Sequence, residues 1–182
     1  MAKTRVAFIG AGGIAQAHLG NLARMEDVAV TAVADVDEER ARKAAAPFGA
    51  RVFADHRALY DAGGFDAVYI CIPPFAHTDQ ELIAAELGIP FFVEKPHALS
   101  MELARRVEAA AAAKSLVTAV GFQDRYLDIM GEMRAFFREH RALLIEGGWI
   151  GVMPPTPWWR RKELSGGQHV EQTIHLFDAL RY

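Results

Sequence analysis

The sequence predicts an α/β protein: a doubly wound parallel sheet followed by an incomplete second α/β domain. Strand-like apolar runs alternate with helix-like runs through the first two thirds of the chain, which is the pattern of successive β–α units. Runs 28–34 and 67–72 are apolar on both faces, as strands covered by helices on each side must be. The first run, 4–9, passes into a glycine-rich turn and then into a helical pattern. In such sheets the ligand crevice lies at the carboxyl ends of the strands.

The first part of the chain is expected to alternate strands and helices throughout. The expected strands cover 4–9, 28–34, 51–53, 67–72, 90–94 and 116–122. The expected helices cover 13–25, 37–47, 55–62, 76–87 and 100–114. Acidic residues from Asp37 favour the start of the second helix, and Pro47 with Gly49 favours its end. Ser100 is expected to cap the last of these helices.

The regular alternation of strand-like and helix-like segments ends at residue 122. A helix is expected over 126–140, and its apolar stripe is expected to be core: Leu127, Met130, Met133, Phe136 and Phe137. Residues 142–152 resemble a strand with a glycine break, 153–164 form a loop rich in Pro and Trp, and a helix is expected from about 168 onward. We therefore place a first domain at 1–122 and the start of a second at 123–182.

Composition narrows the class of protein. The 182 residues are 52% hydrophobic and 24% charged, which suffices for a core. The net charge is −3, and the 20 basic residues are scattered among 23 acidic ones, so we expect no nucleic-acid partner. The single cysteine, Cys71, excludes a disulfide framework and reads as a buried thiol. No run reaches membrane-spanning length, so we expect no membrane partner and a cytoplasmic location.

The glycine-rich turn has the spacing G-x-G-x-x-A of a dinucleotide-binding loop, Gly10-Ala11-Gly12-Gly13-Ile14-Ala15. Gly10 lets the chain turn sharply off the strand, and Gly12 removes a side chain where a pyrophosphate must approach the backbone. Ala15 is small enough for the helix to pack on the strand, and the N–H groups at the helix start face the phosphates. A glycine triplet alone is weak evidence, and the strand before it strengthens the interpretation.

Asp35 closes the second expected strand at a suitable distance from this turn. Its carboxylate can accept hydrogen bonds from an adenosine ribose and would repel a 2′-phosphate, which favours NAD over NADP. The alternative is that Asp35 only caps the helix starting near Val36.

Residues after two further expected strands could bind a cofactor or a substrate. Pro73-Pro74 make a rigid turn, and His77 after it either reaches a cofactor or caps and packs. Glu94-Lys95-Pro96 place an ammonium at the crevice mouth, where Lys95 can polarise a substrate hydroxyl or carbonyl. The alternative for this pair is a solvated loop.

These motifs, with Ala34-Asp35 and Val120-Gly121-Phe122, resemble in order and spacing the Gfo/Idh/MocA oxidoreductases, the family of glucose–fructose oxidoreductase and inositol dehydrogenase. The resemblance implies an N-terminal Rossmann domain and a C-terminal α/β domain on an open sheet. It implies NAD(P)-dependent oxidation of a sugar-like or cyclitol hydroxyl, with Lys95 as the active-site lysine. The substrate is then a small sugar or polyol, and the full-length form is expected to be a homo-oligomer.

The resemblance extends to Glu171-Gln172-Thr173-Ile174-His175, where the family usually carries Asp-x-x-x-His. His175 matches the family's general acid/base, a role that suits imidazole chemistry. Glu171 departs from the pattern by one methylene. The alternative is an amphipathic helix that packs Ile174, Phe177 and Leu180 inward and leaves His175 partly exposed.

The expected site residues follow from these motifs. The catalytic residues are Lys95, His175 and Glu171. The cofactor contacts are Gly10, Gly12, Gly13, Ile14, Ala15, Asp35, Pro73, Pro74, His77, Glu94, Lys95 and Gln123. The substrate contacts are Arg125, Trp159 and Arg160, the last two from a segment with Trp158 and Arg161 that suits a sugar face, a lid or an interface. No metal site is expected.

Members of this family are longer than this chain, so we interpret the sequence as C-terminally truncated. The leading hypothesis is an NAD(P)-dependent dehydrogenase. Two alternatives stay open: a non-catalytic NAD-binding module or regulatory protein, and an NAD-dependent lyase or glycosidase of the same fold.

Overall fold

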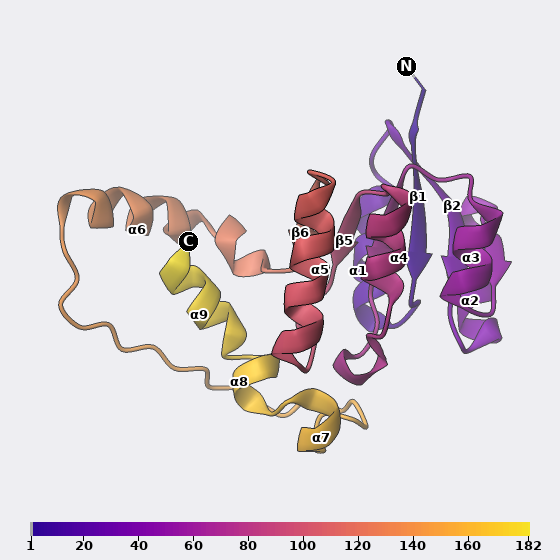
Figure 1. Ribbon diagram of the computed structural model, residues 1–182. Helices are drawn as coiled ribbons and strands as arrows, with labels where there is room; N and C mark the ends of the chain where they lie inside the picture. The colour runs from indigo at the N-terminus through magenta and orange to yellow at the C-terminus, as the bar shows by residue number, and fades with distance from the viewer. Residues whose placement is uncertain (1) are drawn as a thin grey trace. The chain divides into compact units, whose positions relative to one another are not determined.

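The computed structural model describes residues 2–182. The chain divides into two compact units, an N-terminal unit that ends at Val120 and a C-terminal unit, Gly121–Tyr182. The N-terminal unit is built on one six-stranded parallel sheet in the order β3-β2-β1-β4-β5-β6 (Figure 1). Its strands are β1 (Thr4–Ile9), β2 (Val28–Ala34), β3 (Arg51–Phe53), β4 (Ala67–Ile70), β5 (Phe91–Val93) and β6 (Thr118–Val120). The strand order reverses direction between β1 and β4, the position where doubly wound sheets bind ligands.

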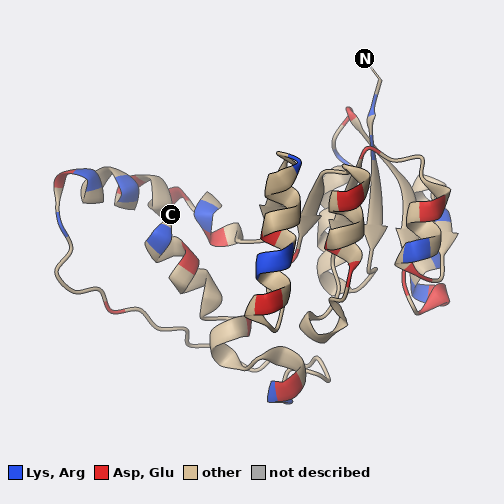
Figure 2. Cartoon of the chain, viewed as in Figure 1, with Lys and Arg blue, Asp and Glu red and all other residues tan. Residues whose placement is uncertain are grey.

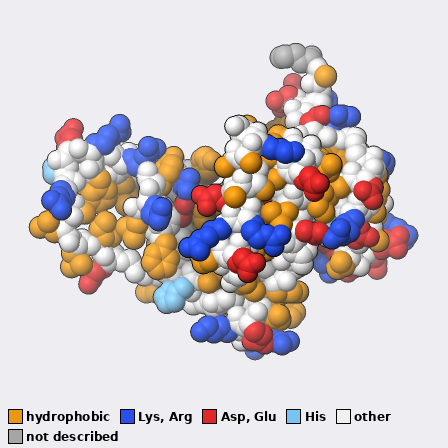
Figure 3. All heavy atoms as spheres, viewed as in Figure 1, with side chains coloured by type: hydrophobic (Ala, Val, Ile, Leu, Met, Phe, Trp, Pro, Cys, Tyr) orange, Lys and Arg blue, Asp and Glu red, His pale blue; other side chains and the backbone are white. Residues whose placement is uncertain are grey.

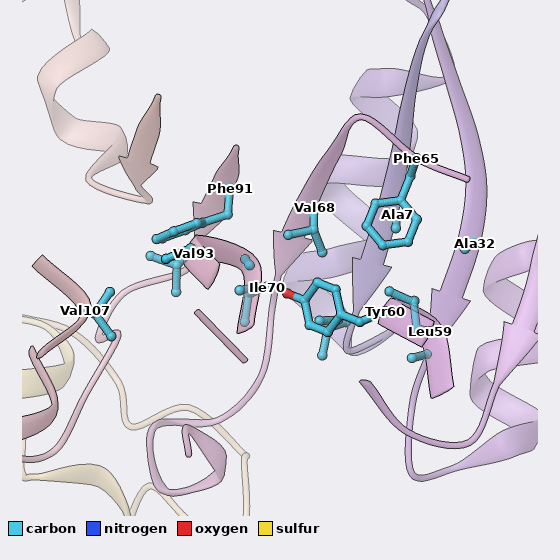
Figure 4. Packing of buried hydrophobic residues seen from close by; sticks show 14 residues of the cluster. Ala7, Ala32, Leu59, Tyr60, Phe65, Val68, Ile70, Phe91, Val93 and Val107 are labelled. Carbon is cyan, nitrogen blue, oxygen red and sulfur yellow. The ribbon is translucent and has the colours of Figure 1, made fainter. Parts of the chain in front are cut away.

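Both faces of the sheet are covered, as the apolar strands predict. Alternate residues of β1 point to opposite faces: Val6 and Phe8 belong to one buried cluster, and Ala7 and Ile9 to another. The first cluster packs α1 (Gly13–Leu22) and α2 (Glu38–Ala45), and the second packs α3 (His56–Ala62), α4 (Gln80–Leu87) and α5 (Met101–Ala113). Figure 4 shows the second cluster around Ile70 and Val68. Full burial of a side chain such as Ile70 contributes about 1.5–3 kcal/mol.

Local signals set the helix ends. The Asp37 carboxylate accepts a hydrogen bond from Arg40 N and caps α2, and the Ser100 hydroxyl accepts one from Leu103 N and caps α5. A short 3-10 turn, Ala46–Phe48, and the left-handed Gly49 end the α2 segment, as expected. The fourth helix begins at Gln80 instead of 76, because Pro74–Ala76 form a 3-10 turn and His77 is extended.

The C-terminal unit contains only helices and irregular segments among its described residues. Its helices are the 3-10 turn Gln123–Tyr126, α6 (Asp128–Glu139), α7 (Lys162–Ser165), α8 (Gln168–Glu171) and α9 (Ile174–Arg181). The strand expected at 142–152 is wrong, since that stretch is irregular and the unit offers it no strand to pair with. The single helix expected from 168 is interrupted at Gln172–Thr173, between α8 and α9.

The apolar stripe of α6 is not the core that its spacing suggests. Met130 is buried, whereas Leu127, Phe136 and Phe137 are exposed. Figure 3 shows hydrophobic side chains open on this face of the C-terminal unit. The stripe has the right period, but the described residues of the C-terminal unit form no sheet for it to cover. None of the helices in residues 2–182 has the length and apolar character needed to cross a membrane.

Candidate functional site

The sheet register brings four sequence motifs to one edge. Ile9 pairs with Ala34 of β2 and with Ile70 of β4, and Ile70 pairs with Val93 of β5. The residues that follow these positions are therefore neighbours at the carboxyl edge: Gly10, Asp35, Cys71 and Glu94. The glycine turn, the acidic strand end, the Pro-Pro turn and the Glu-Lys-Pro segment all begin here, as the sequence predicts for a ligand crevice.

Only a glycine fits at position 10, because of its backbone conformation and the close approach of a neighbouring strand end. Its φ is +90°, and a Cβ atom added to it would lie 2.2 Å from the carbonyl oxygen of Cys71. Its N–H donates to the carbonyl of Ala34 at 2.8 Å. The chain therefore turns tightly off β1 between β2 and β4, and only glycine fits this turn.

The rest of the glycine loop leaves room where a diphosphate would lie. Cβ atoms added at Gly12 and Gly13 would meet nothing within 4 Å. Gly12 is the N-cap of α1, and no side chain caps this helix. The first N–H groups of a helix have no partner within it, so they and the helix dipole suit an anion. Ala15 is fully buried against the sheet, the packing role expected of it, while Ile14 is 44% exposed. The loop fits the diphosphate of a dinucleotide.

Asp35 is tied to the glycine loop. One carboxylate oxygen, Oδ2, accepts a hydrogen bond from Ala11 N at 2.8 Å, and Oδ1 accepts one from Asp37 N at 2.8 Å. The side chain is buried, and Arg40 forms an ion pair with it at 3.4 Å. The cap of α2 is Asp37, so the alternative that Asp35 only caps this helix is wrong.

His77 is packed in the interior of the N-terminal unit, which agrees with one of the two roles that the sequence left open. Its imidazole is fully buried, and Nδ1 lies 2.5 Å from Oε1 of Glu81, which is also fully buried. Pro74 is buried in the turn just before it. Sequence reasoning missed Glu81, although the i,i+4 spacing of a histidine and a glutamate at a helix start was a signal for this contact.

Glu94 is held in place rather than solvated. Its Oε1 lies 2.7 Å from Nε2 of His18 on α1, and its Oε2 accepts a hydrogen bond from Lys95 N at 3.1 Å. Glu94 is buried, so the solvated-loop alternative is wrong for this residue. The His18 ring lies 4.9 Å from the ring of Phe92, the residue two positions before Glu94.

His18 is therefore a site residue that the sequence analysis missed. Its contact joins segments 76 positions apart, and no local pattern announces such a contact. It links α1, the helix that follows the glycine loop, to the turn that carries Lys95. His97, beyond the Lys95–Pro96 bond, is mostly buried, and this burial lowers its pKa.

The C-terminal unit holds the remaining expected residues. Glu171 and His175 are both buried, and Trp158 Nε1 donates to Glu171 at 3.3 Å. The His175 ring stacks on Trp149 at 5.7 Å. Phe177 and Leu180 are more than half exposed. The alternative that packs these two inward and exposes the histidine is therefore wrong.

The remaining predicted residues of this unit differ in their contacts and in their exposure to solvent. Arg125 forms a two-pronged ion pair with Asp178, with its Nε 2.6 Å from Oδ2, and this hydrogen bond raises the pKa of Arg125. Its guanidinium also lies over the Tyr182 ring at 4.9 Å. Gln123 and Arg160 are exposed, and Trp159 is half-buried. Arg125 thus braces α9, whereas Gln123 and Arg160 face solvent. Residues 2–182 contain no cluster of three histidine, cysteine or acidic side chains suited to a metal ion.

Comparison with known proteins agrees with this geometry. A family model described as an oxidoreductase family with an NAD-binding Rossmann fold matches residues 4–122. The fold and the strand-edge site thus define an NAD-binding Rossmann protein. The chain belongs to the Gfo/Idh/MocA oxidoreductase family.

Several relatives have stated activities or ligands. Inositol 2-dehydrogenase of Pseudomonas syringae pv. syringae is 34% identical over 97% of this chain and 51% of its own length. The crystal structure of GenD2 from gentamicin A biosynthesis, in complex with NAD, is 26% identical with a TM-score of 0.83, covering 100% of this chain and 53% of that one. Myo-inositol dehydrogenase from Lactobacillus casei, in complex with NAD(H) and myo-inositol, is 31% identical with a TM-score of 0.70, covering 75% and 41%. The chain spans about half the length of the curated relatives it matches.

Proposed function

We propose that this chain is the coenzyme-binding part of an NAD-dependent oxidoreductase that transfers hydride between the nicotinamide and a hydroxyl of a sugar or cyclitol. One observation carries the proposal: the glycine loop is uncapped and open at α1, and Asp35 is hydrogen-bonded to that same loop. The combination provides an anion site and a carboxylate within one short segment of the sheet edge. The inositol dehydrogenases among the relatives support a polyol as the substrate class.

The side chains have distinct roles in this proposal. The N–H groups at the start of α1 bind the diphosphate, and Asp35 accepts hydrogen bonds from the adenosine ribose. Bound NAD supplies the hydride acceptor. Lys95 polarises the substrate hydroxyl. His18 contacts Glu94, and Glu94 accepts a hydrogen bond from the backbone of Lys95, so His18 helps to hold the turn that contains Lys95. His175 accepts the hydroxyl proton, and Glu171 supports it; both belong to the C-terminal unit.

The first test is binding followed by turnover. Isothermal titration of the chain with NAD should give one site per chain, and absorbance of the reduced coenzyme should rise on a panel of inositols and sugars. Lys95→Ala should retain the NAD affinity and lose turnover, because the lysine acts on the substrate and not on the diphosphate. Equal turnover in that variant would contradict the role of Lys95.

A second candidate is an NAD-binding module without turnover. It is favoured by the location of the glycine loop, Asp35 and Lys95 in one compact unit, which needs no second unit to bind a dinucleotide. Tight NAD binding with no reduced coenzyme on any polyol or sugar would favour this candidate over the dehydrogenase.

A further inference from the structure

The end of β2 holds a small charged cluster that the proposed function uses only in part. Asp35 is fixed there by two backbone N–H groups, one on each carboxylate oxygen. A carboxylate oxygen can accept about two hydrogen bonds, so Oδ2, which accepts one from Ala11 N, can accept another, whereas Oδ1 faces both Asp37 N and Arg40 NH1. These two hydrogen bonds hold the carboxylate beside the glycine loop.

Arg40 lies between two carboxylates in this cluster. Its NH1 is 3.4 Å from Oδ1 of Asp35, and its NH2 is 3.0 Å from Oδ2 of Asp37. The Arg40 side chain is half exposed, at 49%, so it is not packed into the interior. Asp35 is 6% exposed at its side chain, whereas Asp37 is 46% exposed.

The other cations of α2 have their own partners along the helix. Arg42 pairs with Glu38 and Lys43 pairs with Glu39, both at i,i+4. Figure 2 shows both signs of charge on α2. Among the ion pairs of residues 2–182, the pair with Arg40 is the one that reaches Asp35. Arg40 is thus the helix cation placed to act at the ribose position.

The charge balance of the cluster favours a free ribose hydroxyl. Asp35 and Asp37 carry two negative charges against the one positive charge of Arg40, so the cluster has a net charge of −1. A 2′-hydroxyl can donate a hydrogen bond to Asp35, whereas a 2′-phosphate brings a charge of about −1.5 to −2. An arginine near this position is the group that accommodates such a phosphate in other dinucleotide-binding folds.

We propose that Asp37 is a coenzyme-specificity residue. Asp37 is the second carboxylate on the Arg40 guanidinium, beside Asp35, and its charge offsets the cation that would otherwise bind a 2′-phosphate, so that the site selects NAD over NADP. Asp35 supplies the fixed negative charge, and Asp37 controls whether the nearby positive charge can compensate for it. This inference rests on the proposed function, because it concerns the same coenzyme site.

The decisive variant is Asp37→Asn. An asparagine keeps the N-cap, because its side-chain oxygen can still accept from Arg40 N, but it removes the charge that holds the guanidinium. The ratio of NADP to NAD affinity, measured by isothermal titration, should rise roughly tenfold, because one of the negative charges near the phosphate is lost and Arg40 keeps only one of its two carboxylate partners. The affinity for NAD should change little.

Matched controls separate this effect from a general change in charge. Glu38→Gln removes the same charge one residue along the helix, where its partner is Arg42, and should change the ratio less than twofold. Arg40→Gln should lower the ratio, whereas Arg42→Gln should not. The double variant D37N/R40Q should lose the gain of D37N, and that gain should shrink at high salt. Circular dichroism of each variant checks that it is folded.

These measurements distinguish failure of NAD binding from failure of the role proposed for Asp37. If the folded, unaltered chain binds neither coenzyme, the proposed function fails and this inference fails with it. If NAD binds but Asp37→Asn leaves the ratio unchanged, or Glu38→Gln raises it equally, or the gain persists in D37N/R40Q, the inference is overturned and the proposed function stands. If Asp37→Asn does not fold, Arg40→Gln decides, and an unchanged ratio in that variant overturns the inference.

Discussion

Gly10 and Gly12 stand two positions apart in one loop, yet they are glycines for different reasons. Gly10 needs a positive φ and lies against the backbone of Cys71, whereas Gly12 has an ordinary φ of −71° and open space beyond its Cα. The first glycine is therefore required by the fold, and we propose that the second is required by the ligand. Stability and binding measurements on the two positions should separate these roles.

Gly10→Ala should destabilise the N-terminal unit by at least about 2 kcal/mol, because a Cβ atom would overlap a backbone carbonyl in a strained conformation. Gly12→Ala is the matched control: it should unfold near the wild-type urea concentration while losing NAD affinity. Urea denaturation of both variants measures the difference. Equal stability of the two variants would show that the tight turn at Gly10 is not needed.

The His18–Glu94 contact is a second prediction at the residue scale. A double-mutant cycle with His18→Ala and Glu94→Ala should give a coupling energy of about 1–3 kcal/mol. Each side chain is mostly buried, so truncating one leaves the other buried without its partner. The exposed pair Arg42–Glu38 is the control and should give about 0.3–0.5 kcal/mol. Coupling energies of the same size would mean that the buried contact does not fix the Lys95 turn.

The sequence predicted the candidate site unevenly at this scale. The sequence predicted that the glycine loop, Asp35 and the Lys95 segment lie at one sheet edge, because they follow strand ends and parallel strands bring their ends together. His18 and Glu81 were missed. The first acts through a contact 76 positions away, and the second through a buried pair whose i,i+4 signal is also common on exposed helices.

At the scale of elements, β1 is joined to the start of β4 by an ion pair outside the ladder. Arg5 donates to Asp66 from its backbone N at 2.8 Å, from Nε at 3.1 Å and from NH2 at 2.6 Å. The Arg5 side-chain hydrogen bond and then its backbone hydrogen bond lower the pKa of Asp66 from 3.8 to about 2. This contact lies beside the first residue pair of the β1–β4 ladder, Val6 and Ala67.

The low pKa of Asp66 makes a prediction about acid stability. A carboxylate whose pKa is lower in the folded state stabilises the fold above the unfolded value of about 3.9, and loses that contribution as pH falls toward 2. The stability difference between wild type and Asp66→Asn should therefore shrink between pH 5 and pH 2. Chemical denaturation at several pH values measures it. A difference that stays constant over this range would contradict the ion pair.

The strands were predicted correctly where an apolar segment also has a neighbouring strand to pair with. All six strands of the sheet were placed to within a few residues, because each is apolar on both faces or ends at a turn signal. The failure at 142–152 has a physical cause: β-branched and leucine residues favour a strand only when a partner strand is available. Most of the α6 stripe failed as core for the related reason that the described residues of the C-terminal unit form no sheet for it to cover.

Hydrogen exchange tests the correction at 142–152. Amides in the central strands β1 and β4 should be strongly protected, while those of 142–152 should exchange near the rate of an unfolded chain, because side chains such as Leu143 and Ile150 are almost fully exposed. Mass spectrometry of exchanged peptides reads both regions in one experiment. Protection at 142–152 equal to that of β4 would restore the strand.

At the scale of the whole molecule, the coenzyme machinery and the second unit differ in what the sequence could predict. The N-terminal unit contains a complete parallel sheet, two packed faces and the strand-edge site. The C-terminal unit buries Glu171 and His175 but leaves many apolar side chains exposed.

The most direct test of the coenzyme site is an amide NMR titration of the isotope-labelled chain with NAD. The account predicts that the largest shifts occur at Gly12, Gly13 and Ile14, at the uncapped start of α1, with a second group at Asp35 and Asp37. Binding without shifts in this loop, or shifts centred on another part of the chain, would contradict the central claim that the carboxyl edge of this sheet holds the dinucleotide.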